Sequence, residues 1–415
     1  MLLIFCIIVM IMIMNRIQVL SLTLKYSNSI RRHKTVMINS NSNDKVFDIK
    51  QHKFSIAPMM EYTDRHMRTL QRLMSSEAVL YTEMVTTNAL VRNAHDTRRF
   101  LGWDYNVEEP LVLQLGGSDP GQMKIASKIA NNEGYNQINI NCGCPSDKVA
   151  GAGCFGASLM LKPDLVAELS LAVGEATGRP ATIKCRIGVD DNDSYDQLVN
   201  FIRTVSEVGK VTHFIVHARK ALLGGKFSPE DNRKIPPLKY DYVYNLVKDF
   251  PHLHFSINGG INTMEEIKLH LEKGVAGVMV GRAVINFPYY WRSIDSQIYN
   301  KPDAMLSRRE IIERYSTYAQ HIENTEGQRA RRALMKPILN LFSGEPNGKL
   351  FRRIMDSTIN ELSIPIEQVI TSSIQCLRDT TLDSTEPNKV SKSSAETLSI
   401  FTSNRQQSTL SDSSY

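Results

Sequence analysis

The stretch from 141 to 158, NCGCPSDKVAGAGCFGAS, contains three of the six cysteines of this 415-residue chain. Its residue types suit a metal or redox site, a phosphate-binding loop, or a single reactive thiol. A metal or redox pair is disfavoured because Cys142-x-Cys144 has no second cysteine or histidine pair at ligand distance. The glycines at 151–156 match the dinucleotide-binding fingerprint only formally. That fingerprint opens a helix directly after a strand, and here residues 142–150 intervene.

Along the whole chain, polar side chains and glycines stand at the ends of short apolar runs. Glycine lets backbone N–H groups approach phosphate oxygens closely, and Arg282 adds a bidentate fork, so the last two run ends favour a phosphorylated ligand. An amide such as Gln114 and a cation such as Lys184 suit the pyrimidine edge and the N1–O2 side of a flavin. In chain order the run-end residues are Pro58, Met59, Met60, Gln114, Asn141, Lys184, Arg186, His217, Asn258, Gly259, Gly260, Gly281 and Arg282.

Such residues need a scaffold that brings the run ends together. Eight apolar, often β-branched runs alternate with segments of helical spacing, and most of the runs are followed by such a segment. Eight strand–helix units of this length are typical of an α/β fold, the (β/α)8 TIM barrel, which carries its active site at the carboxyl ends of its strands. A doubly wound open sheet is the alternative. The runs are 53–58, 78–82, 111–116, 137–141, 181–187, 213–218, 252–258 and 275–280.

After residue 301 the strand pattern stops. Three stretches have amphipathic helical spacing, with glycine and proline turns between them, namely 306–321, 329–343 and 349–362. We therefore expect a TIM barrel over 51–300 and a small all-helical domain over 301–378. The Ser- and Thr-rich segment 379–415 has too few apolar residues to offset its chain entropy, and it is predicted to be disordered.

The N-terminal extension, 1–50, opens with an almost wholly apolar run that is shorter than the roughly 20 residues of a membrane-spanning helix. Basic residues follow, with no acidic residue before Asp44, as in organellar presequences. We favour import into an organelle, mitochondrion or plastid, over the cytoplasm, and a mature protein without a membrane anchor. An unstructured extension and a start at Met37 are the alternatives.

Overall charge and cysteine usage set broad limits. The chain has 49 Lys and Arg against 43 Asp and Glu, a formal net charge of +6, which permits nucleic acid as a partner without establishing it. The few, irregularly spaced cysteines predict a reducing compartment rather than a disulfide framework.

Nine blocks of the sequence, in order, resemble the tRNA-dihydrouridine synthases, and among them the A-type branch fits best. The resemblance runs from about Phe54 to Ile370 and so includes both the barrel and the helical region. The blocks are APMMEYTDRHMR, YTEMVTTNAL, LVLQLGGSDP, ININCGCPSDKVAGAGCFGASLM, IKCRIGVDD, VHARKALL, RKIPPLKYDYV, INGGI and GVMVGRA.

The resemblance implies roles for particular residues. It makes Cys144 the catalytic proton donor and places Asn141 and Arg186 beside the substrate. Arg233, Lys349 and Arg352 match positions that orient the tRNA, although residues 224–226 include one extra residue and Glu230 replaces an expected lysine. The FMN contacts carry over to Pro58, Met59, Met60, Gln114, Lys184, His217, Asn258, Gly259, Gly260, Gly281 and Arg282.

The implied reaction reduces the C5–C6 double bond of tRNA D-loop uridines, at positions 20 and 20a, with NADPH. A hydride passes from N5 of FMN to C6, and the thiol of Cys144 protonates C5. A thiol suits this task because its ordinary pKa, about 8.5, keeps it mostly protonated at neutral pH. Lys184 and Arg186 would stabilise the developing charge. We expect a monomer without a metal ion.

Two rival functions remain. An FMN barrel that reduces a free pyrimidine would use nearly the same chemistry but would not need a basic helical domain. A tRNA-binding protein or chaperone with vestigial chemistry would not need the complete set of flavin positions or Cys144.

Overall fold

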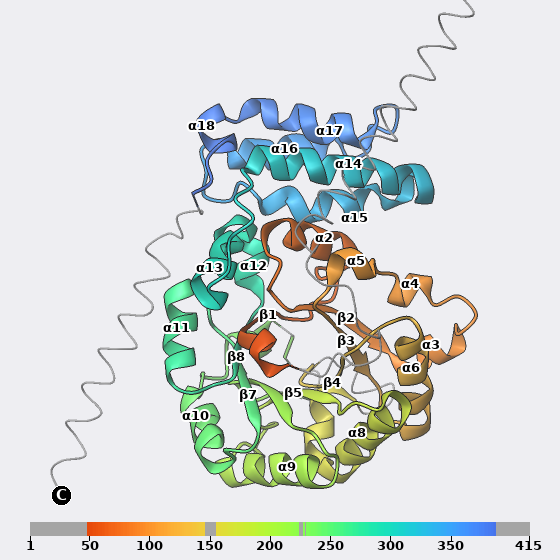
Figure 1. Cartoon of the computed structure of the whole chain (residues 1–415), viewed down its shortest axis with the longest axis vertical. Coiled ribbons are helices and arrows are strands. Elements are labelled where there is room, and N and C mark those ends of the chain that lie inside the picture. Colours follow the sequence, from red (N-terminus) through yellow and green to blue (C-terminus); the bar gives the residue numbers. More distant parts are fainter. Residues whose placement is uncertain (1–47, 146–154, 224–226, 229, 387–415) are drawn as a thin grey trace, which may run out of the picture. The chain divides into compact units, whose positions relative to one another are not determined.

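A computed structural model describes residues 48–145, 155–223, 227–228 and 230–386. The described residues form one compact unit. Eight parallel strands follow one another around a ring in the order β1-β8-β7-β6-β5-β4-β3-β2, and the predicted (β/α)8 barrel is confirmed (Figure 1). Bonds from Ile56 N to Val79 O (2.9 Å) and from Val79 N to Phe54 O (3.1 Å) close the ring between β1 and β2.

The strands lie where the apolar runs predicted them, with ends that differ by a few residues. They are β1 (Phe54–Ile56), β2 (Leu80–Thr86), β3 (Leu111–Gly116), β4 (Ile138–Cys142), β5 (Thr182–Arg186), β6 (His213–His217), β7 (His254–Asn258) and β8 (Gly277–Val280).

Helices and 3-10 turns connect the strands and form the outer layer, except η1, which precedes β1 and lies at one end of the barrel (Figure 1). They are η1 (Ile49–Lys53), α2 (Arg65–Met74), α3 (Thr87–Arg92), α4 (Arg98–Leu101), α5 (Tyr105–Glu108), α6 (Pro120–Asn132), η2 (Gly156–Leu161), α8 (Pro163–Thr177), α9 (Tyr195–Glu207), η3 (Asp231–Arg233), α10 (Tyr240–Asp249), α11 (Met264–Glu272), α12 (Arg282–Asn286), η4 (Pro288–Ser293) and α13 (Ile294–Tyr299).

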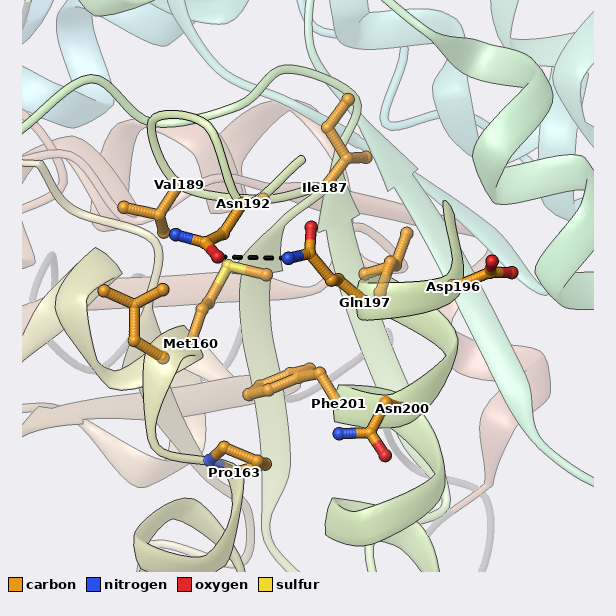
Figure 2. A pocket seen from close by; sticks show the side chains of 12 residues that line it. Met160, Pro163, Ile187, Val189, Asn192, Asp196, Gln197, Asn200 and Phe201 are labelled. Carbon is orange, nitrogen blue, oxygen red and sulfur yellow. Dashed lines mark hydrogen bonds between the residues drawn. The ribbon is translucent and has the colours of Figure 1, made fainter. Parts of the chain in front are cut away.

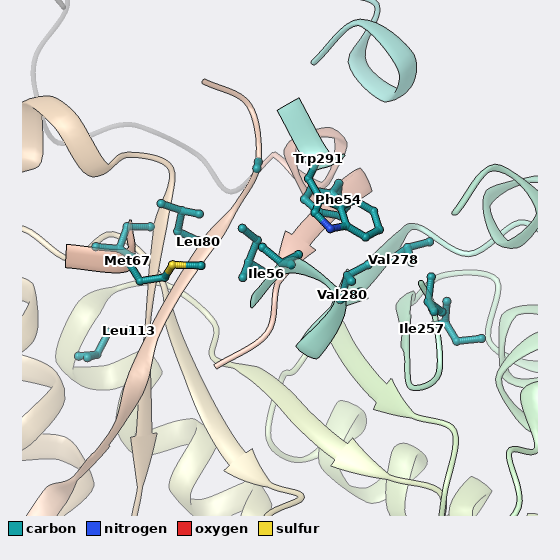
Figure 3. Close-up of a cluster of buried hydrophobic side chains, with 14 of the residues drawn as sticks. Phe54, Ile56, Met67, Leu80, Leu113, Ile257, Val278, Val280 and Trp291 are labelled. Carbon is teal, nitrogen blue, oxygen red and sulfur yellow. The ribbon is translucent and has the colours of Figure 1, made fainter. Parts of the chain in front are cut away.

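Side chains alternate along the strands, except at a register shift in β2 between Tyr81 and Met84. One set packs between strands and helices, as Figure 3 shows for Phe54, Ile56, Val278 and Val280, and the Phe54 ring stacks on Trp291 at 5.5 Å between centroids. The other set faces the barrel interior and forms a separate apolar cluster of Ala57, Val79, Tyr81, Val112, Ile215 and Met279. Because the period is two, the polar residues of the second set also point inward.

The helical region after the barrel consists of α14 (Arg308–Glu326), η5 (Gln328–Ala330), α15 (Arg331–Met335), η6 (Lys336–Asn340), α16 (Gly348–Thr358), α17 (Ile366–Ser373), η7 (Ile374–Cys376) and α18 (Asp379–Leu382). The first and third predicted helices are present. The second is broken into α15 and η6, because Pro337 has no backbone N–H to continue an α-helix.

Two predicted boundaries need correction. The fold begins inside 1–50, because Asp48 caps η1 and His52 of that turn is buried. Residues 379–386 belong to the fold rather than to a disordered tail. Arg309 pairs there with Asp379 and Asp383, and Leu382 is buried. Of the rest of both termini, 1–47 and 387–415 lie outside the described residues. No described helix is long and apolar enough to cross a membrane.

The amino-terminal end of the barrel is closed by buried histidines. His52 pairs through Nε2 with Gln137 Oε1 (2.9 Å), and its ring lies 5.0 Å from that of His213, which pairs with Ser256 Oγ (2.8 Å). Burial lowers the pKa of His52 to about 4 and lowers the pKa of His213 as well.

These histidines predict acid-sensitive stability. Above pH 6.5 they are neutral in both states. Below pH 6.5 these histidines bind protons in the unfolded chain but stay neutral in the folded barrel. The free energy of unfolding therefore falls as the pH drops from 6.5 towards 4. With a pKa lowered from 6.5 to about 4, His52 alone accounts for on the order of 3 kcal/mol at the acid end. Urea unfolding of His52→Asn should show a shallower pH dependence, whereas His95→Asn, on an exposed residue, should match the parent protein. Equal slopes in all three proteins would contradict the assignment.

Candidate active site at the carboxyl ends of the strands

Strand register brings the predicted site residues together. Asn141 on β4 pairs with Lys184 on β5, Arg186 pairs with His217 on β6, and His217 pairs with Asn258 on β7. All five occupy inward-facing positions near the carboxyl ends of their strands. The structure therefore assembles at one mouth the residues that lie far apart in the sequence.

A chain of amides runs from the barrel interior to the Cys144 turn. Asn139 Nδ2 donates to Thr182 Oγ1 (2.9 Å), and Gln114 Nε2 donates to Asn139 Oδ1 (2.8 Å). Asn141 Nδ2 then donates to Gln114 Oε1 (2.8 Å). Because each amide fixes the orientation of the next, Gln114 and Asn141 are held in single orientations.

Asn141 shapes the turn that carries the thiol. Its Oδ1 accepts hydrogen bonds from the backbone N–H groups of Gly143 and Cys144, both at 3.0 Å. The carbonyl of Cys144 in turn accepts from Ala157 N (2.8 Å). Cys144 is partly exposed at this turn, whereas Cys142 is fully buried, and burial raises its pKa well above the usual range. Cys142 is thus a packing residue, while Cys154 lies outside the described residues.

Arg186 is buried and bonded to backbone carbonyls at the mouth. It is 4% exposed, and it donates from Nε to Gly143 O (2.8 Å) and from Nη1 to Lys220 O (2.8 Å) and Asn232 O (3.1 Å). These carbonyls belong to three separate loop segments at the mouth. Arg186 therefore fastens the cysteine turn to the loops after β6, and only Nη2 lacks one of these backbone contacts.

Lys184 is a partly buried cation beside the thiol turn. Within the described residues its ammonium makes no hydrogen bond or ion pair, and burial, together with Arg186, lowers its pKa to about 8. His217 is also partly buried. Burial and the neighbouring cations Lys184, Arg186, Arg219 and Arg282 lower its pKa well below the usual value.

Three arginines stand in the segments that follow β6 and β8, namely Arg219, Arg233 and Arg282. Burial and Arg233 lower the pKa of Arg282, and burial and Arg282 lower the pKa of Arg219. Arg233 Nε is buried without a hydrogen-bond partner among the described residues. Arg219 was not singled out from the sequence, although it stands two residues after His217 in the same strand-end loop.

The glycines of this region allow close packing of the strand-end loops. Gly259 and Gly260 have φ angles of 112° and 74°, which side-chain-bearing residues rarely adopt. A Cβ on Gly259 would lie 2.5 Å from the His217 ring, and one on Gly281 would lie 3.5 Å from Met59 Sδ. Met59 and Gly281 therefore meet where β1 and β8 adjoin. Asn258 Nδ2 donates to Met279 O (2.8 Å) and ties β7 to β8.

The remaining predicted residues lie at the rim or beyond it. Pro58 is partly buried and Met60 is 56% exposed. Lys349 and Arg352 are exposed on α16, away from the thiol turn. A cavity of about 220 Å³ between the β1–α2 loop and the helical region is lined by Arg352 together with Glu61, Tyr62 and Lys336.

A larger cavity, of about 390 Å³, lies between η2, the end of β5 and α9 (Figure 2). Asn192 and Gln197 face each other across it through a 3.0 Å hydrogen bond. None of the predicted site residues lines this cavity, and its lining contains no cation. Volume alone would therefore misplace the site, because the chemically equipped region is the mouth around Cys144.

The mouth of this α/β barrel combines a partly exposed thiol with cations that make no ion pair among the described residues. This arrangement is that of an enzyme active site suited to an anionic ligand. The family description "Dihydrouridine synthase (Dus)" matches residues 55–379, and the chain belongs to this family.

Similar proteins with an assigned function share one description within this family. A tRNA-dihydrouridine(20/20a) synthase of Vibrio parahaemolyticus is 44% identical over 306 residues, covering 72% of this chain and 90% of the relative. The Synechocystis protein of the same description is 45% identical over 317 residues, covering 76% and 92%. The Shewanella oneidensis protein is 44% identical over 336 residues, covering 80% and 96%.

Proposed function

We propose that the protein is a tRNA-dihydrouridine(20/20a) synthase. It reduces the C5–C6 double bond of D-loop uridines, holds FMN, and takes electrons from NADPH. Family membership and similarity to relatives of that description support the proposal. The single observation that carries it is the mouth itself, where the Cys144 turn lies beside the partly buried ammonium of Lys184, which has no partner among the described residues.

The residues present fit FMN. Buried cations without a carboxylate partner are unfavourable unless an anion joins them. Among the described residues, the buried Nε of Arg233 meets that description, and the partly buried ammonium of Lys184 also has no carboxylate partner. Arg282, with the glycines at 259–260 and 281, would hold the phosphate. Gln114, with one amide hydrogen donated to Asn139, has a second available for the flavin pyrimidine edge.

Bound FMN supplies the hydride. The chain then needs an acid at C5 of the uridine, and Cys144 provides it from a turn that Asn141 and Arg186 hold in place. Lys184 stabilises negative charge that develops near it. The uridine must leave its stack to reach this mouth, and the partly exposed position of Cys144 is compatible with an entering base.

Arg233, Lys349 and Arg352 supply the tRNA contacts in this proposal. Lys349 and Arg352 are exposed on α16 and make no ion pair within the described residues. Cations of this kind neutralise phosphates and release counterions, which gives binding that weakens with salt.

The cofactor assignment has a direct test. The purified protein should show a flavin absorption spectrum, which NADPH bleaches anaerobically in the absence of tRNA. NADH is the comparison, and we expect it to bleach the spectrum more slowly. A colourless protein that binds tRNA but gains no flavin on incubation with FMN would favour the chaperone alternative.

A further inference from the structure

The short turn η6 (Lys336–Asn340) joins the helical region to two loops of the barrel mouth. Lys336 Nζ donates to Glu61 O (2.6 Å) and lies 4.4 Å from the centre of the Tyr62 ring. Asn340 Nδ2 donates to Ile285 O (2.9 Å) in α12, the helix that begins at Arg282. Both loops carry predicted flavin contacts, because Glu61 directly follows Met60.

The loop after β1 is held both from within the barrel and from the helical region. Within the barrel, Glu61 N–H donates to the Glu83 carboxylate, and Tyr62 N and Thr63 N donate to Met59 O, both at 3.0 Å. Glu61 has a φ of +66°, which costs free energy for a residue with a side chain. The Lys336–Glu61 carboxylate pair is solvated and 3.9 Å apart, and such pairs contribute little. From the helical region, the bond of Lys336 to the Glu61 carbonyl and its contact with the Tyr62 ring are therefore the restraints that add to those of the barrel.

The same turn is in contact with a predicted tRNA-orienting residue. Arg352 Nη2 donates to Ser343 Oγ (3.3 Å), just beyond η6, and Arg352 lines the 220 Å³ cavity with Lys336, Glu61 and Tyr62. Thus η6 lies between a side chain that faces the tRNA and the loop that faces the flavin.

We propose that Lys336 is a positioning residue that holds the β1–α2 loop in its flavin-binding conformation from the helical region. This inference rests on the proposed function, since it takes FMN as the ligand of that loop. Its consequence is that the helices that hold tRNA also support the flavin site.

The test measures FMN affinity without tRNA. Titration of the apoprotein with FMN should show about fivefold weaker binding for Lys336→Met, the effect of losing one partly exposed hydrogen bond. Lys336→Arg should restore binding, because a guanidinium also donates to a carbonyl and stacks on a ring. Arg332→Met is the matched control, since Arg332 is exposed on the adjoining α15 without a barrel contact among the described residues. It should bind FMN like the parent protein.

A second variant guards against a folding defect. Tyr62→Leu removes the ring beneath the ammonium and leaves η6 intact, and it should also weaken FMN binding. Parent-like FMN affinity in both Lys336→Met and Tyr62→Leu, with only the KM for tRNA raised, would overturn the inference and make Lys336 an ordinary phosphate contact. Failure of the parent protein itself to bind FMN would instead overturn the proposed function.

Discussion

Cys144→Ala is expected to keep its flavin and to accept electrons from NADPH, yet to form dihydrouridine about 100- to 10,000-fold more slowly, the usual contribution of a positioned acid. The thiol stands on a turn whose N–H groups bond to Asn141, and alanine leaves those bonds in place. Single-turnover mixing of the NADPH-reduced variant with tRNA separates the two half-reactions.

Cys142→Ala is the matched control for this variant. Cys142 is fully buried among apolar side chains, and it contributes no group to the mouth. We expect parent-like turnover with a small loss of stability. Parent-like turnover in Cys144→Ala would remove Cys144 from the mechanism and assign the proton to water or to another residue.

Arg186→Met should lower kcat on tRNA by on the order of 100-fold, because misplacing a reacting group by a small distance is costly. The substitution leaves the carbonyls of Gly143, Lys220 and Asn232 without their shared donor, so we also expect a loss of about 2–4 kcal/mol in unfolding free energy. Rapid kinetics should show flavin reduction by NADPH close to the parent rate, because the affected turn is that of the proton donor.

The Arg186→Lys variant separates positioning from charge. A lysine keeps the positive charge but cannot donate along the separate directions that the guanidinium uses. If Arg186 acts by holding the loops, lysine should rescue little of the kcat. Rescue to near the parent rate would show that charge on the substrate is the main contribution.

Much of the barrel could be predicted because its signals are local. Eight apolar runs with period two place Gln114, Asn141, Lys184 and His217 on inward positions, and parallel register then brings them to one mouth. The ends of β3 matched closely, since Leu111–Gly116 is bounded by Pro110 and Gly117.

The features that could not be predicted depend on contacts between distant segments. From the sequence, Arg186 was expected to contribute its charge beside the substrate. Its hydrogen bonds to the carbonyls of Gly143 and Lys220 depend on how the loops pack, which the sequence does not reveal. The docking of residues 379–386 likewise follows from tertiary contacts, whereas the break at Pro337 has a local cause, the missing backbone N–H of proline. In the docked segment, Thr381 and Leu382 become buried within a stretch whose composition is polar.

The proposed reaction is tested most directly by incubating unmodified tRNA with the flavin-loaded protein and NADPH, and mapping dihydrouridine by mass spectrometry of nuclease fragments. The expected result is the mass increase of two added hydrogens on uridines in the D-loop, at positions 20 and 20a, with free uracil and orotate unchanged. Unchanged tRNA alongside reduction of a free pyrimidine would contradict the proposed function and identify a small-molecule reductase.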